Sequence, residues 1–349
     1  MLFARRMQAA SASSPDAARF PDLLAAALRS WTQHRGDDGV FTMAIPLQGV
    51  DPLVQLPLLE TAQPFRFLWD SAPGLSLAAS GRCHHLDLAG PKRFELAQRF
   101  SDVTLARLID ASPGAPAQAR SRVLLAFSFF SNPGHSSADG LPQGSSIPAV
   151  QAVLPRWQLS RHGRQGWLRI HGVAQQSADV RDLVEALWGM RERIQAPQAQ
   201  ACLPTWQGAV GTVQGTKPWQ QMYAPALEQA IALVNGGDLH KLVLAVRQSI
   251  SLEAPLDPLP LLARLRQQQA GSCRFLWQRS GGDAFFGASP ERLLSLRGGQ
   301  LRSDALAGTA GQGDNGEALL QSDKDRREHE LVVQTITEQL QQQGSRSRR

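Results

Sequence analysis

Cysteine is scarce in this sequence: Cys83, Cys202 and Cys273 are the three cysteines among 349 residues, and they lie far apart. They form no CxxC pair, so neither a disulfide framework nor a zinc site is indicated, and a reducing compartment is the simpler inference. Long apolar runs are missing as well. The best candidate, residues 123–130 (VLLAFSFF), is far shorter than the roughly eighteen residues that a membrane helix needs. We therefore expect no membrane span and interpret this run as a buried strand.

The usual nucleotide-binding signals are absent too, since there is no Walker-type loop and no GxGxxG after a strand. The net charge of +6 comes mostly from scattered single arginines, with the densest cluster at residues 346–349. Such scattered charge indicates a solvated surface or an anionic metabolite rather than nucleic-acid binding, so we expect no nucleic-acid partner. The first fifteen residues carry two arginines and no acid. We interpret them as a flexible tail rather than a transit peptide, and expect a cytoplasmic protein.

What is present is the composition of a soluble globular protein, with 42% hydrophobic and 19% charged residues. Between residues 41 and 170, short apolar runs alternate with glycine, proline, serine and aspartate, which favours antiparallel sheets over βαβ units. Two hairpins are expected around residues 280–283 and 298–299, and a strand at 241–246. Helical apolar spacing predicts helices at residues 21–32, 92–100, 179–193, 217–235, 258–269 and 317–343.

Changes in composition divide the chain into four predicted segments. A flexible tail occupies residues 1–20, and an N-terminal half occupies 21–200. A second half spans 201–343, and an atypical basic tail covers 344–349.

Two charged residues interrupt apolar stretches of the second half. Lys241 opens the predicted strand 241–246, where the commoner interpretation is a charge reaching solvent at a strand end. The alternative is a lysine partly desolvated in a cleft, where it could act as a base. Glu291 follows Pro290 in a turn between strand runs, and a solvated glutamate is again the usual interpretation.

Two further stretches could bind an anion and a cation. In Ala307-Gly308-Thr309 the small residues let backbone N–H groups approach an anion closely, although a plain strand end has the same pattern. Glu328 belongs to a charge run that is typical of a solvated helix face. It lies three and four residues before Leu331 and Val332, beside the apolar stripe. A carboxylate placed there needs a partner, and a divalent cation would serve.

Taken in order, the stretches KLVLA, FFGASPERLL, SDALAGT and SDKDRREHELVV resemble the chorismate-binding enzyme family. That family contains isochorismate, salicylate, aminodeoxychorismate and anthranilate synthases. The similarity runs from about residue 237 to 340, and weaker similarity extends over residues 65–80, 124–130 and 154–168.

The resemblance implies a role for each candidate residue. Lys241 takes the position of the base that activates water, and Glu291 that of the general acid. Glu328 takes the position of a carboxylate that holds Mg²⁺. Gly308 and Thr309 match the loop whose backbone faces the substrate carboxylate.

The branch of the family follows from two positions, again by resemblance. Lys241 favours the water-adding or aminodeoxychorismate enzymes. Ala307 stands where aminodeoxychorismate synthases have a nucleophilic lysine, which favours the isochorismate and salicylate branch. The implied activity is Mg²⁺-dependent conversion of chorismate to isochorismate, for quinone (menaquinone or phylloquinone) or siderophore synthesis. Salicylate formation and a non-catalytic remnant that binds chorismate remain as alternatives.

The implied fold is α+β, with two large antiparallel sheets packed together and helices outside, in a monomer. Family members continue beyond the position of Gln343 with a segment that carries another magnesium carboxylate and the last strands. We therefore expect the fold to be incomplete at the C-terminus, and the polypeptide as written to be unstable or inactive.

Overall fold

The computed structural model describes residues 19–34, 39–59, 61–62, 64–71, 74–131, 148–196, 219–245, 252, 255–279, 283–311, 313 and 316–344. These residues form two compact units. The first takes its residues from Met1–Trp206 and Asp257–Pro290, and the second from Gln207–Leu256 and Glu291–Arg349. In the described part of the chain, no helix is long and apolar enough to cross a membrane. Most of the predicted N-terminal tail and of the basic C-terminal tail lies outside the described residues.

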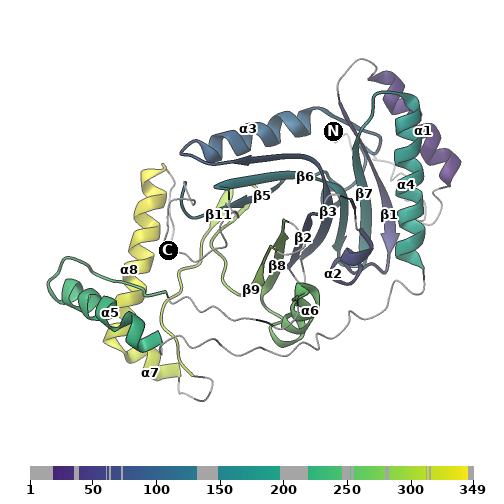
Figure 1. Cartoon of the computed structure of the whole chain (residues 1–349). Coiled ribbons are helices and arrows are strands. Elements are labelled where there is room, and N and C mark those ends of the chain that lie inside the picture. Colours follow the sequence, from purple (N-terminus) through teal and green to yellow (C-terminus); the bar gives the residue numbers. More distant parts are fainter. Residues whose placement is uncertain are drawn as a thin grey trace, which may run out of the picture. The chain divides into compact units, whose positions relative to one another are not determined.

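The first unit is built on one nine-stranded sheet (Figure 1). Its strands run in the order β4-β1-β7-β6-β3-β2-β8-β9, and β5 pairs with the free part of β6. All described neighbours are antiparallel except β1 and β4, so the sheet is mixed. The strands are β1 Val40–Gln48, β2 Arg66–Ser71, β3 Leu75–Leu88, β4 Leu108–Asp110, β5 Leu124–Phe127, β6 Val150–His162, β7 Gln165–Val173, β8 Cys273–Gln278 and β9 Ala284–Ser289.

Helices of the first unit cover this sheet. α1 (Phe20–Gln33) and α4 (Ser177–Gln195) lie side by side, and α4 packs on β7 and β1 (Figure 1). α3 (Arg93–Ala106) packs on β6 and β3, whereas α6 (Pro258–Gln268) packs on β9 and β8. The short α2 (Pro52–Gln55) contacts β2 and β3. The predicted helices at 21–32, 92–100, 179–193 and 258–269 are thus confirmed, with bounds shifted by a few residues.

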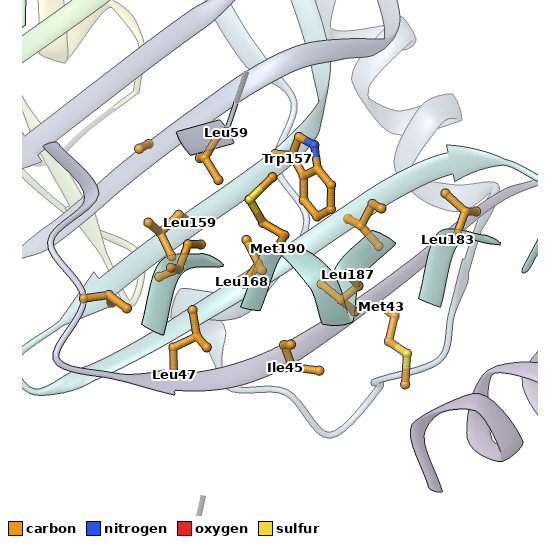
Figure 2. Close-up of a cluster of buried hydrophobic side chains, with 14 of the residues drawn as sticks. Met43, Ile45, Leu47, Leu59, Trp157, Leu159, Leu168, Leu183, Leu187 and Met190 are labelled. Carbon is orange, nitrogen blue, oxygen red and sulfur yellow. The ribbon is translucent and has the colours of Figure 1, made fainter. Parts of the chain in front are cut away.

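The core of the first unit lies between α4 and the strands beneath it. Figure 2 shows side chains from β1, β6 and β7 gathered against those of α4. The alternating pattern of each strand sends every second residue to this face, and the helical spacing of α4 supplies the opposite face. The labelled members are Met43, Ile45, Leu47, Leu59, Trp157, Leu159, Leu168, Leu183, Leu187 and Met190.

A buried ion network ties the late segment Asp257–Pro290 to the early strands. β8 pairs with β2 over six residues, and Asp70 of β2 accepts hydrogen bonds from Arg274 of β8 and Arg266 of α6. Both shortest distances to its Oδ2 are 2.8 Å. Arg266 also pairs with Asp51 at 2.6 Å. Because Asp70 and Arg274 are almost fully buried, this pairing can stabilise the fold only while both charges are present.

The second unit contains three helices and one hairpin among its described residues. They are α5 Trp219–Asn235, α7 Gly316–Gln321, α8 Asp323–Gln342 and the strands β10 Ser295–Arg297 and β11 Gln300–Arg302. The hairpin turns at Gly298 (φ 55°) and Gly299 (φ 77°), which is the type I′ geometry that requires positive φ at both central residues. The antiparallel pairing of β10 with β11 and of β8 with β9 confirms both predicted hairpins, although residues 280–282 lie outside the described residues.

Two predictions for the second unit are wrong. The helix predicted over residues 317–343 is broken at Ser322, because the Oγ of Ser322 accepts a hydrogen bond from the backbone N–H of Asp325 and thereby caps α8. The strand predicted at 241–246 does not form over residues 241–245, and residue 246 lies outside the described residues. A strand needs a ladder partner, and no described residue pairs with 241–245; Val243 is instead 77% exposed.

The predicted fold class, α+β with largely antiparallel strands and outer helices, is confirmed. Within the described residues the sheets differ in size from the prediction: one is large and mixed, and the other is the two-stranded hairpin β10–β11. The segment 241–245, which was predicted to be a strand, contributes to neither sheet in the part of the chain described here.

Candidate active site

Lys241 is positioned by the end of helix α5. The backbone N–H of Gly236 donates to the carbonyl oxygen of Ala232 at 2.8 Å, and Gly237 then takes φ +82°. This left-handed glycine lies just beyond the last residue of the helix, Asn235, which is also where the predicted helix ended; glycine adopts that conformation at little cost. The chain reverses there and reaches Lys241 four residues later.

Glu328 lies in the second turn of α8, and its carboxylate meets Lys241. The Nζ of Lys241 is 2.8 Å from Oε1 of Glu328, and each of the two side chains is 32% exposed. Asp325, Glu328, Leu331 and Val332 are all half-buried on one side of α8, so Glu328 does lie beside the apolar stripe. The structure thus joins two residues that the sequence had placed in separate roles.

The loop before α7 contributes Gly308. It has φ +87°, and a Cβ added there would lie 3.2 Å from Cδ1 of Leu319 and 3.5 Å from Cβ of Asp325. Glycine is therefore required for backbone conformation and for space, and its absence of a side chain lets the loop backbone approach the first turn of α8. Of its neighbours, Ala307 is half-buried and Thr309 is exposed.

Asp325 is the functional candidate that the sequence analysis missed. Its Oδ1 lies 3.6 Å from the point that a Gly308 Cβ would occupy. The available signal was its spacing, because residues three apart on a helix share a face and Asp325 precedes Glu328 by three. In the sequence this aspartate was hidden within a charge run that is typical of a solvated surface.

Glu291 lies at the surface in the turn that follows β9, between Ser289 and β10. Pro290 precedes it, as the predicted turn required. Its part as a general acid stays a prediction.

Two acidic side chains of the second unit lie one turn apart on α8. Asp325 and Glu328 lie on one face of α8; Asp325 lies close to Gly308 in the loop before α7, and Glu328 pairs with Lys241. An anionic substrate that approached this loop would be repelled by them unless a cation lay between. No group of three or more His, Cys, Asp or Glu side chains suited to a metal occurs among the described residues. Mg²⁺ nevertheless needs only one or two carboxylates, because water and substrate oxygens complete its octahedron.

The chain belongs to the chorismate-binding enzyme family. The sequence model of that family, described as "Chorismate binding enzyme", matches residues 24–349. The match covers both units, including the weaker N-terminal half of the resemblance.

Curated relatives and a solved structure carry the comparison to particular proteins. The chain is 38% identical over 124 residues to the salicylate biosynthesis isochorismate synthase of Pseudomonas aeruginosa, which covers 34% of this chain and 26% of that protein. It is 35% identical over 158 residues to the isochorismate synthase MenF of Pasteurella multocida, covering 41% of this chain and 37% of the relative. MenF of Escherichia coli is 29% identical over 201 residues, or 54% of this chain and 44% of the relative.

The solved structure of MenF, described as the menaquinone-specific isochorismate synthase from Escherichia coli, matches the fold. Its TM-score is 0.63 at 22% identity, over 91% of this chain and 69% of that one. At this identity the likeness shows the fold alone. The chain matches less than half of the length of each of the three curated relatives.

Proposed function

We propose that this protein is an isochorismate synthase, which converts chorismate to isochorismate by Mg²⁺-dependent addition of water at C2 with loss of the C4 hydroxyl. The observation that carries the proposal is the 2.8 Å contact between Lys241 and Glu328, in a chain whose relatives are named isochorismate synthases. The contact brings the expected base and the expected metal carboxylate together.

Each residue has one task in the proposed reaction. Lys241 accepts a proton from the water that attacks C2, and Glu291 donates a proton to the departing C4 hydroxyl. General acid–base participation of this kind contributes typically about 10²- to 10⁴-fold for each group. Backbone N–H groups at Gly308 and Thr309 bind a substrate carboxylate, because both residues are exposed.

Asp325 and Glu328 are the side chains that would hold magnesium. Magnesium held there would offset the charge of the ring carboxylate of chorismate and anchor it. The absence of a lysine at Ala307 leaves water as the nucleophile, which supports isochorismate as the product. Either quinone or siderophore synthesis would consume it, and relatives named for menaquinone and for salicylate synthesis both occur.

Incubation of the full chain with chorismate and Mg²⁺, followed by chromatography of the products, tests the proposal. Isochorismate as the sole product would support the proposal and overturn the expectation that the polypeptide as written is inactive; Glu291→Gln should then reduce turnover by about 10²-fold or more. Glu338→Gln makes the same chemical change on an exposed position of α8 and should leave turnover unchanged.

Other products would identify the alternatives. Salicylate with pyruvate would indicate a salicylate synthase. Chorismate binding without any turnover would indicate a non-catalytic remnant. Full activity in Glu291→Gln would remove that residue from the mechanism.

A further inference from the structure

We infer that Lys241 competes with the divalent cation for the carboxylate of Glu328, so that the residue assigned as base also sets the metal affinity of the site. This inference rests on the metal-binding part of the proposed function. Its consequence is that metal entry and release of the lysine amine from Glu328 are one event.

The geometry of the ion pair is the first argument. With Nζ 2.8 Å from Oε1, the ammonium occupies the position at which a cation would approach that oxygen. Mg²⁺ binds carboxylate oxygens at about 2.0–2.1 Å, so both cations cannot use Oε1 in this arrangement. Even if the metal took the other carboxylate oxygen, a dication and an ammonium would lie within a few ångströms and repel each other.

The surroundings allow the exchange. Each side chain of the pair is 32% exposed, so water and ions reach it, and partly exposed ion pairs of this kind are weak. The backbone at residues 241–245 belongs to no helix or ladder within the described residues. Lys241 can therefore swing away from α8 without breaking regular structure, and Glu328 stays on its helix for the incoming cation.

A second carboxylate on the same face favours a dication over the lysine. Asp325 lies one turn before Glu328, and one ammonium compensates only one of the two negative charges. A divalent ion between these side chains compensates both. The Lys241 ammonium and a free divalent cation therefore compete for these two carboxylates.

Metal binding to the full chain, measured without chorismate, tests the inference. Mn²⁺ is titrated by electron paramagnetic resonance, and Mg²⁺ is then added as a competitor. Lys241→Gln should bind Mn²⁺ about tenfold more tightly than the natural chain, because it removes the competing charge and keeps a polar side chain. Lys241→Arg keeps the charge and should bind no more tightly. Lys92→Gln removes an equal charge from the first unit and should change nothing.

Glu328→Gln completes the design, and we expect it to weaken Mn²⁺ binding strongly. Circular dichroism checks that each variant is folded. Equal Mn²⁺ affinity in Lys241→Gln and the natural chain would overturn the inference, as would tighter binding in Lys241→Arg. Failure of all variants to bind metal would also overturn it. The product assay of the natural chain is independent: tighter Mn²⁺ binding in Lys241→Gln, together with no isochorismate formed by the natural chain, would support the inference and contradict the proposed reaction.

Discussion

Replacement of Asp70 by asparagine tests how the late segment Asp257–Pro290 is held in the first unit. Asp70 Oδ2 accepts from Arg274 Nη2 and Arg266 Nε, each at 2.8 Å. Arg274 is 0% exposed, and Asp70 is its carboxylate partner. Arg266 has a second carboxylate, Asp51, at 2.6 Å, and its side chain is 25% exposed. Asp70→Asn therefore leaves the buried Arg274 without its carboxylate partner, whereas Arg266 keeps Asp51.

The expected changes in the free energy of unfolding follow from this difference between Arg274 and Arg266. Breaking a buried pair from one side costs about 3–5 kcal/mol, so we expect Asp70→Asn to lower the free energy of unfolding by that amount. Arg274→Met leaves Asp70 paired with Arg266 and should cost less, about 1–3 kcal/mol. The double variant, Asp70→Asn with Arg274→Met, has no buried cation that lacks a carboxylate partner. Its free energy of unfolding should therefore lie within about 1 kcal/mol of that of Arg274→Met.

Urea unfolding followed by far-ultraviolet circular dichroism measures the four free energies of this cycle. The expected coupling between the two sites is about 2 kcal/mol or more. An additive cycle, or an Asp70→Asn variant no less stable than Arg274→Met, would refute the reasoning.

The ion pair between Asp70 and Arg274 also predicts how the stability of the fold changes at acid pH. Burial raises the pKa of Asp70. The charge of Arg266 and the hydrogen bond and charge of Arg274 together lower it by more, so the pKa lies below its usual value of 3.8. A carboxylate with a depressed pKa stabilises the fold above its unfolded value, and that contribution is lost as pH falls through the folded value. Asp70→Asn should remove this component of the acid sensitivity.

Two further predictions concern His171 and Gly308. Burial, and then the charge of Arg169, lower the pKa of His171 to about 3, so stability should fall as pH drops from about 6.5, by about 2 kcal/mol at pH 5. His171→Gln should reduce the difference in urea midpoint between pH 7 and pH 5; an unchanged difference would show that His171 is not responsible. Gly308→Ala should cost about 1–2 kcal/mol of backbone strain and weaken chorismate binding, measured by calorimetry. Gly313→Ala, where nothing lies within 4 Å of the added Cβ, is the control, and equal affinities in the two variants would contradict the proposed role of the loop.

Local patterns in the sequence were enough for most elements of the first unit. The helix predicted at 179–193 appears as α4, because its apolar residues recur with helical spacing and face a sheet. The turn at Gly298 and Gly299 was equally predictable, since two adjacent glycines permit the backbone that a tight hairpin requires. Both cases depend on interactions between residues close in sequence.

Predictions that depended on distant partners were less successful. The segment at 241–245 has the apolar pattern of a strand, but a strand forms only where another edge supplies its hydrogen bonds. The helix over 317–343 had continuous spacing, yet the serine at 322 competes for a backbone N–H and starts a new helix.

Motif order by itself determined the family and nominated Lys241, Gly308 and Glu328, because residue type and spacing along the chain carry that information. Only the tertiary structure decided that Lys241 and Glu328 form an ion pair and that Asp325 lies against Gly308. These contacts join α8 to residues that precede it in separate segments. They depend on how a glycine-ended helix and a glycine loop direct the backbone towards α8, and no periodicity within a single segment records that geometry.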